Sequence, residues 1–378
     1  MSTNTSTTPL RTGTKERLQS LDTLRGFDMA MLVGLGSVIV ALANLSGWNW
    51  MEGLATQVHR HVEWEGFRFY DMIFPLFMFI SGVAIPYAIN SKREKGVAQS
   101  LLLRKIFIRL LLLIAFGIIY NGATSRGFTN TRYVSVLSQI GFGYFFAALI
   151  SLYSKSIKGS LYWMLGIMAG IAALQLFVPV PEFGAGTFEP ATSINAWLDQ
   201  KLIPGRLNDE VFDPEGVLCI VSAITITLMG TLAGHVLRSS PLKPSKKALY
   251  IALAGVGALA LAYALRPVYP VIKKMWTVPY VMMAGGYSAL LLSLFYFVID
   301  VKGYKNWTLF FRVFGMNSIT IYMGARILGF RDISRFFLNW TSIHISEEWG
   351  AVFIAIGVVV LQWALLLFLY RRKIFLRV

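Results

Sequence analysis

Long apolar stretches separated by short polar segments recur along the whole of this 378-residue chain. A hydrocarbon core about 30 Å thick needs roughly 20 mostly apolar residues in each helix that crosses it. Ten stretches have about this length, at residues 21–44, 71–90, 101–121, 133–153, 160–179, 216–237, 247–265, 276–299, 308–328 and 351–371. The pattern predicts an all-α fold, a polytopic transmembrane helix bundle with about ten spans.

The composition agrees with this class of protein. Hydrophobic residues make up 56% of the chain and charged residues 14%, whereas soluble domains carry about 25% charged residues. The single cysteine excludes a disulfide scaffold, and the apolar content excludes a disordered chain. The formal net charge is +16. In an apolar chain, basic residues collect in cytoplasmic loops, so we expect a lipid bilayer and no nucleic acid as partner.

The distribution of Lys and Arg predicts the orientation of the bundle. With a cytoplasmic N-terminus, the cytoplasmic segments hold 20 of these residues and the opposite segments hold 11, as the preference of basic loops for the cytoplasm requires. We therefore expect both termini to be cytoplasmic. Residues 1–20 form a polar cytoplasmic tail and residues 21–378 the transmembrane domain. No convincing cleavage site follows the first span, so we expect an uncleaved anchor.

Two segments on the side opposite the termini are too long to be simple turns. Residues 45–70 contain three tryptophans and two histidines, and residues 180–215 are rich in proline. Long connections are either functional or disordered, and this aromatic content argues against disorder. We expect both segments to form a structured cap or mouth.

Charged residues at the start of the first span form one candidate site. Asp22, Arg25 and Asp28 follow each other at intervals of three, so both acids can flank the arginine on one helix face. An ion pair that fixes the helix end is the plainer interpretation. Binding of an anion is the alternative, because a guanidinium suits phosphate or carboxylate.

A second cluster surrounds His61, just before the second span. A histidine among aromatic residues at a membrane entrance can act as a base or a nucleophile, and Asp71 at the start of the span can orient it. His59 and His61 would be needed together for a metal site. That alternative is weak, because the chain has four histidines, no HExxH motif and no cysteine pair. We therefore expect no metal.

The remaining polar residues of the spans give weaker signals. Asn121 ends the third stretch, Ser138 and Gln139 lie in the fourth, Glu215 belongs to a helix start, and Asn317 opens the ninth stretch. Hydrogen bonding to a neighbouring helix is the commoner role of an intramembrane asparagine. The chain has no P-loop, no GxGxxG after a strand and no GxSxG elbow. Soluble catalysis is not supported.

The motifs, taken in chain order, resemble those of the heparan-alpha-glucosaminide N-acetyltransferase family and its bacterial members. The matching motifs are Ser20-Leu-Asp22-Thr-Leu-Arg25-Gly26, His61-Val-Glu63-Trp64-Glu65-Gly66, Asp71-Met-Ile-Phe74-Pro75, Phe79-Ile-Ser-Gly82, Phe212-Asp-Pro214-Glu215-Gly216, Lys274-Met-Trp276-Thr277, Val298-Ile-Asp300-Val-Lys302-Gly303 and Gly315-Met-Asn317-Ser318. They extend over nearly the whole transmembrane chain.

The resemblance implies a transmembrane acyltransferase that moves acetyl from cytoplasmic acetyl-CoA to an amino sugar on the far side of the membrane. The catalytic histidine of the family falls on His61 and its carboxylate on Asp71. The bacterial branch implies a multi-pass protein of the bacterial inner membrane with glucosamine or a short amino sugar as acceptor. We expect no large N-terminal lumenal domain of the kind that the lysosomal enzyme carries, and this expectation argues against a polymeric acceptor.

Further site residues are assigned from residue type and position along the chain. We assign Arg25, Arg104, Asn121 and Asn317 to donor binding and Glu63, Trp64 and Glu215 to acceptor binding. Many relatives have a Gln-Arg pair where this chain has Ser138-Gln139. If that arginine contacts the donor, Arg104 or Arg132 must replace it here.

Three questions stay open at the level of sequence. An amino-sugar permease with His61 and Asp71 as a proton relay is the main alternative to the enzyme, and a scaffold with degenerate chemistry is another. His61 can act as a general base or carry the acetyl group. A homodimer is a further open partner assignment.

Overall fold

The computed structural model describes residues 18–122, 131–154 and 156–376, so residues 1–17 of the expected tail lie outside the described part of the chain. Its membrane-scale helical segments start with α1 (Gln19–Ala30), η1 (Met31–Leu35) and α2 (Gly36–Ser46), which form one continuous rod. The others are α4 (Phe69–Ile85) with η2 (Pro86–Asn90) and α5 (Ser91–Glu94), α6 (Gln99–Tyr120), α8 (Val136–Tyr153), α9 (Ile157–Phe177), α11 (Val217–Ser239), α12 (Pro244–Leu265), α13 (Val278–Phe295) with η5 (Tyr296–Val301), and α18 (Glu347–Arg371). The predicted all-α class is confirmed.

Eight helical segments within the described residues are long and apolar enough to cross a membrane. The third and ninth expected stretches are helical but differ from the other eight. The helix α6 carries Arg104, Lys105 and Arg109 in its first half. The ninth stretch is broken at Asn317 into α14 (Thr308–Met316) and α15 (Ser318–Ile327).

Glycines let the helices approach one another closely. A Cβ atom on Gly26 would lie 1.6 Å from the carbonyl oxygen of Phe311, and one on Gly315 would lie 2.1 Å from that of Asp22. The helices α1 and α14 therefore cross backbone to backbone. Such small-residue contacts are a common way to pack helices within a bilayer, and they give Gly26 and Gly315 a structural role.

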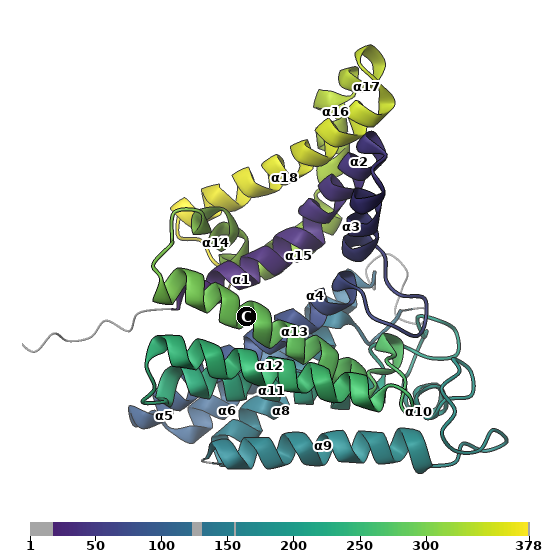
Figure 1. Cartoon of the computed structure of the whole chain (residues 1–378), viewed down its shortest axis with the longest axis vertical. Helices are drawn as coiled ribbons and strands as arrows, with labels where there is room; N and C mark the ends of the chain where they lie inside the picture. The colour runs from purple at the N-terminus through teal and green to yellow at the C-terminus, as the bar shows by residue number, and fades with distance from the viewer. Residues whose placement is uncertain (1–17, 123–130, 155, 377–378) are drawn as a thin grey trace, which may run out of the picture.

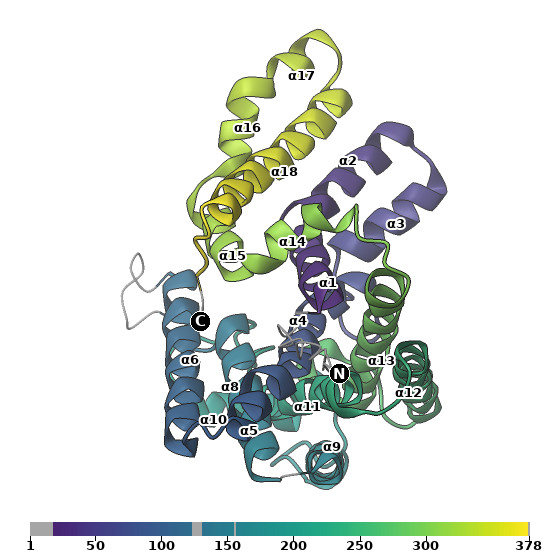
Figure 2. The same ribbon diagram turned by 90° about the vertical axis from the view of Figure 1, so that its left-hand side faces the viewer.

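The two described ends of the chain lie at one face of the bundle, which we call the terminal face (Figures 1 and 2). The backbone N–H of Ser20 donates to Asp300 at the end of η5, and Asn317 holds the segment that follows α18. The opposite face, which we call the far face, carries the two long segments. They contain the short helices α3 (Asn49–His59) and α10 (Ile194–Leu202), so the expected structured segments are each partly helical.

Two more short helices, α16 (Phe330–Leu338) and α17 (Trp340–His344), precede α18. They pack along α18, while α2 and α3 form a second arm of the molecule beside them (Figure 2).

Candidate active site

Two loops of the far face pair with each other and create the candidate active site. Glu65 and Ile272 form an antiparallel bridge, and the N–H of Gly66 donates to the carbonyl of Val271 over 2.9 Å. The second loop then turns through the short helix η4 (Lys273–Met275). This pairing places Lys273 beside His61, although the two residues are 212 positions apart.

His61 and Asp71 form a dyad, as the sequence predicts. The Nδ1 atom of His61 lies 2.7 Å from Oδ1 of Asp71. The Asp71 side chain is fully buried, whereas that of His61 is 49% exposed. The other carboxylate oxygen accepts the backbone N–H groups of Arg68 at 3.0 Å and Val62 at 3.3 Å. The carboxylate is thus fixed from one side while the imidazole remains accessible.

Lys273 is the third member of the site and was missed by the sequence analysis. Its Nζ atom lies 2.7 Å from Nδ1 of His61 and 3.3 Å from Oδ1 of Asp71. Burial lowers the pKa of Lys273 below its ordinary value, and the attraction of Asp71 offsets this only in part. The sequence signal for Lys273 was slight and consisted of its position directly before the Lys274-Met-Trp276-Thr277 motif.

Buried neighbours fix the loop that carries Lys273. Trp276, just after η4, is buried and adopts a left-handed conformation with φ of 50°, which costs free energy for a bulky side chain. Gln175 and Asn195 both donate side-chain N–H groups to the carbonyl of Met275, over 3.0 and 3.2 Å. The surrounding contacts therefore hold a strained turn in place, as is common at functional sites.

The protonation of the dyad follows from its geometry. A neutral imidazole carries one ring proton, and donation of Nδ1–H to Asp71 leaves the lone pair on Nε2 available. Lys273 competes for the same Nδ1 atom and the same carboxylate oxygen. Two groups that can be cationic therefore share one buried anion.

Aromatic residues support the dyad from two sides. The rings of His61 and Tyr70 lie 4.4 Å apart between centroids. The Tyr280 hydroxyl, fully buried, donates to the backbone carbonyl of Asp71 over 2.9 Å. Tyr280 thereby ties α13 to the first turn of α4.

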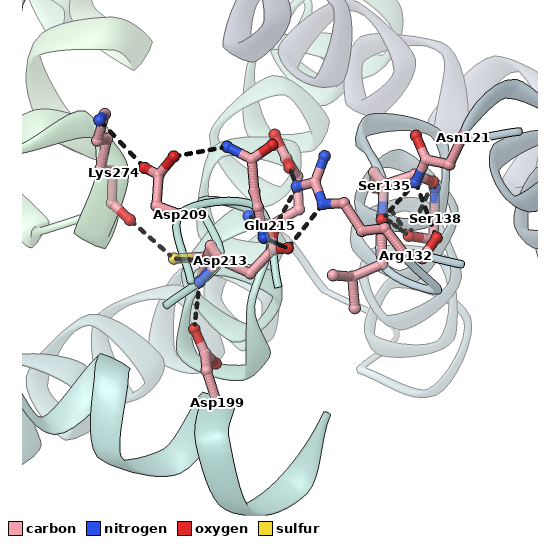
Figure 3. A network of polar contacts seen from close by, with 12 residues as sticks. Asn121, Arg132, Ser135, Ser138, Asp199, Asp209, Asp213, Glu215 and Lys274 are labelled. Carbon is pink, nitrogen blue, oxygen red and sulfur yellow. Dashed lines mark hydrogen bonds and ion pairs between the residues drawn. The ribbon is translucent and has the colours of Figure 1, made fainter. Parts of the chain in front are cut away.

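A second polar network, drawn in Figure 3, lies on the far face, and its Glu215 interacts electrostatically with Lys273. Arg132 binds the carboxylates of Asp213 and Glu215, and its Nε atom lies 2.6 Å from Asp213 Oδ2. Burial disfavours the charged guanidinium, but these two carboxylates outweigh it and raise the pKa of Arg132. Burial also raises the pKa of Glu215, although Arg132 acts in the opposite direction. The predicted acceptor residue Glu215 is therefore engaged by Arg132.

Asp199 on α10 anchors this network. Its carboxylate accepts the N–H groups of Asp213 and Val217 at 3.0 and 2.9 Å, and it is fully buried. Burial raises the pKa of Asp199 from 3.8 to about 6. Sequence reasoning did not single out Asp199, because an acid within the long outer segment gives no local sign of burial.

Glu63 and Trp64, the other predicted acceptor residues, do come together in one pocket. This far-face pocket has a volume of about 460 Å³ and is also lined by Asp209 and Lys274, which form an ion pair over 3.1 Å. The indole N–H of Trp64 donates to the Phe188 carbonyl over 2.9 Å. The pocket thus offers an aromatic face and charges of both signs.

Of the predicted donor residues, Arg25, Asn121 and Asn317 each have their own partners within the protein. Arg25 pairs with Asp22 over 3.7 Å, and Arg104 is exposed at the start of α6. Asn317 is buried, donating to the Ile374 carbonyl and accepting from the Leu376 N–H. Asn121, at the opposite end of α6 from Arg104, donates to the carbonyls of Arg132 and Val134. Gln139, which stands where many relatives have the arginine of a Gln-Arg pair, donates to the carbonyl of Cys219 on α11.

An apolar cavity of about 40 Å³ within the spans has two ionisable side chains in its lining. It is lined by Asp28 and Arg109 and by Ile73 and Phe74, close to Asp71 on α4. Among the described residues, Asp28 Oδ1 and Arg109 Nε have no hydrogen-bond partner. The Arg109 guanidinium lies over the Tyr144 ring, 3.9 Å from its centroid, so Asp28 Oδ1 is the atom of this cavity that marks a candidate ligand site. Asp28, the second acid predicted to flank Arg25, thus lines this cavity.

No cluster of three or more potential metal ligands occurs within the described ranges of the chain.

Comparison with known proteins identifies relatives over most of the chain. Residues 17–189 match a family model described as a domain of unknown function, DUF5009. Heparan-alpha-glucosaminide N-acetyltransferase of Mus musculus is 26% identical over 372 residues, covering 84% of this chain and 54% of that protein. The enzyme of Homo sapiens is 25% identical over 417 residues, covering 96% of this chain and 60% of that protein.

The chain thus spans somewhat more than half the length of these curated relatives. The similarity nevertheless covers most of the chain and confirms the resemblance that the ordered motifs predict. This chain is thus similar, over most of its length, to heparan-alpha-glucosaminide N-acetyltransferase, and its described part holds eight helical segments long and apolar enough to cross a membrane.

Proposed function

We propose that the protein is a transmembrane N-acetyltransferase that moves acetyl from cytoplasmic acetyl-CoA to the amino group of glucosamine or a related amino sugar. The acceptor binds on the periplasmic side of a bacterial inner membrane, and both termini are cytoplasmic. The observation that carries the proposal is the pairing of the accessible His61 with the buried Asp71 at 2.7 Å, in a chain similar to two such enzymes.

His61 supplies the chemistry of the transfer. With Nδ1–H donated to Asp71, Nε2 takes a proton from the acceptor ammonium as a general base, or attacks the thioester carbonyl as a nucleophile. In the second case a bond forms between Nε2 and the acetyl carbon, the carbon–sulfur bond breaks, and CoA leaves as the thiolate. Asp71 stabilises the positive charge that the imidazole acquires.

Lys273 supports the same step from beside the ring. Attack on a thioester develops negative charge on the carbonyl oxygen, and a preorganised cation near that oxygen lowers the barrier. The Nζ atom, 3.3 Å from Nε2 of His61, is placed for this role. Its interaction with Asp71 also holds the amine close to the ring.

The two substrates approach from opposite faces. Arg25 and Arg104 belong to helix ends at the terminal face, where basic side chains suit the phosphates of the CoA nucleotide. The pocket of Glu63 and Trp64 offers the acceptor a carboxylate and an aromatic face.

The decisive experiment measures release of CoA thiol by purified protein with glucosamine as acceptor. We expect release that requires glucosamine and is lost in His61→Ala. The matched control is His344→Ala, which removes an exposed histidine at the end of α17 and leaves the rate unchanged. Absence of release by folded wild-type protein across several amino sugars contradicts the enzyme. Uptake of labelled glucosamine into vesicles without CoA would support the permease instead.

A further inference from the structure

The helix α16 has an unusual distribution of polar residues. Arg331, Arg335 and Asn339 follow each other at intervals of four and so share one helix face. All three line one cavity. Ile333, Phe336 and Phe337 lie outside this cavity and are 41%, 82% and 63% exposed. The helix therefore turns its charges toward a cavity and leaves apolar side chains on the outside.

The cavity lies between the two arms of the molecule and has a volume of about 740 Å³. Its lining residues come from α16 and α18 on one side and from η1 and α2 on the other. Figure 2 shows α16 and α18 beside α2. The α18 wall is largely apolar, with Ile354 and Val358. The cavity thus combines one charged wall with apolar ones, as a site for an amphiphile requires.

The two arginines of this cavity are exposed and belong to a helix that packs beside a candidate membrane span. The hydroxyl of Ser334, which lies between them in sequence, donates to the carbonyl of Ile354 over 2.8 Å. Ile354 is in the interior of the span Glu347–Arg371. An arginine that reaches the hydrocarbon from such a position is costly unless it faces a polar cavity or a partner.

The charges in the cavity are not balanced by the protein. Among the described residues, neither Arg331 nor Arg335 forms an ion pair within 4.0 Å, while Glu347 supplies one carboxylate to the lining. Gln362, also in the lining, is 1% exposed. Its Nε2 donates to Val33, but its Oε1 atom has no partner. Within the described part of the chain, the two arginines of the cavity therefore have no anionic partner, and Gln362 Oε1 has no hydrogen-bond donor.

We propose that this cavity binds a phosphate ester that carries hydroxyl groups, with the phosphate held by Arg331 and Arg335. Guanidinium groups bind phosphate in bidentate fashion, and a ligand hydroxyl satisfies Gln362. The headgroup of phosphatidylglycerol and free glycerol phosphate share this chemistry. His59, two residues before His61, also lines this cavity, so the site adjoins the segment that carries the dyad. The proposal does not depend on the proposed acetyl transfer.

Calorimetric titration of the purified full chain in a neutral maltoside detergent tests the proposal. The probes are dihexanoyl-phosphatidylglycerol, glycerol 3-phosphate and, as the phosphate-free control, dihexanoylglycerol. We expect saturable binding of at least one phosphate ester and none of dihexanoylglycerol. Stronger binding of the lipid identifies a headgroup as the natural source, and stronger binding of glycerol 3-phosphate identifies a soluble ester.

Variants then locate the site. Arg331→Gln and Arg335→Gln are each expected to weaken binding about tenfold, as loss of a charge-assisted hydrogen bond implies. The control is Arg371→Gln, at the opposite end of α18 and outside the cavity, which leaves the affinity within about twofold of the wild type, a small change on the same scale. Gel filtration and melting temperature establish that each variant is folded.

Two results overturn the proposal. One is wild-type protein that binds dihexanoylglycerol as well as the phosphate esters, or binds none of the probes. The other is a folded Arg331→Gln, Arg335→Gln double variant with unchanged affinity. The probe comparison needs no variant, so a misfolded double variant leaves the test intact.

Discussion

Replacement of Asp71 by Asn tests the central geometry of the candidate site. The Asp71 carboxylate interacts with four donors, which are His61 Nδ1, Lys273 Nζ and the backbone N–H groups of Val62 and Arg68. An amide replaces one acceptor oxygen with a donor group. In the variant, the amide N–H₂ group therefore faces either the two backbone N–H groups or the side chains of His61 and Lys273, and in both cases donors face a donor.

The expected effects follow from this count. If the amide group faces the ring, Nδ1 accepts its hydrogen bond, the ring proton moves to Nε2, and the lone pair needed for chemistry is lost. Loss of correctly placed acid–base function lowers rates by about 10²–10⁴-fold. Removal of one member of a buried ion pair costs about 3–5 kcal/mol of stability. Because Lys273 and His61 remain partly accessible, we expect the lower end of that range.

The assay is CoA thiol release at saturating acetyl-CoA and glucosamine, with kcat and KM determined separately. We expect kcat to fall by about 10²-fold or more while KM for the donor changes little, because Asp71 acts on the reacting group. The control is Glu94→Gln, which breaks the ion pair with Arg238 at the terminal face. A folded Asp71→Asn protein with more than half the wild-type kcat would refute the assigned role of the dyad.

Three further predictions address other parts of the structure. We expect Lys273→Met to lower kcat about tenfold, the low end of the range for one lost charge-stabilising group, and to abolish the alkaline decline of the rate. In the wild type we expect the rate to decline as Lys273 loses its proton, at a pH below 10.5 because burial lowers the pKa of Lys273. A pH–rate profile that is unchanged in the variant would exclude this role. Folding raises the pKa of Asp199 from 3.8 to about 6, so the native state holds its proton more tightly than the unfolded chain. The fold is therefore about 3 kcal/mol more stable below pH 4 than above pH 6, and this stability is lost as the pH rises through 6. Thermal melts between pH 4 and 7 are expected to show this decline in the wild type and not in Asp199→Asn, and equal slopes would contradict it. Gly26→Ala places a Cβ atom 1.6 Å from the Phe311 carbonyl oxygen, so we expect a loss of about 1–3 kcal/mol or more from overpacking, seen as a lower melting temperature; Gly53→Ala, with no atom nearby, is the control, and equal melting temperatures of the two variants would refute the close crossing.

Much of the site could be predicted locally and much could not. His61 and Asp71 are ten residues apart across a single helix start, so their pairing is visible in the sequence. Lys273 reaches them only because two far-face loops bridge at Glu65 and Ile272. Such long-range pairing leaves no periodic signal. The donor assignments to Asn121 and Asn317 rested on residue type, whereas the structure engages both side chains with backbone groups.

The sequence by itself determined the class of fold. In a bilayer the backbone hydrogen bonds of a span must be satisfied within the helix, so a sufficiently long apolar stretch already specifies its own secondary structure. Arg331, Arg335 and Asn339 show the limit of this rule: their spacing placed them on one face, but only the packing of α16 along α18 decided that this face lines a cavity. The tertiary structure decided partners and orientation, because these depend on which surfaces the helices bury against one another.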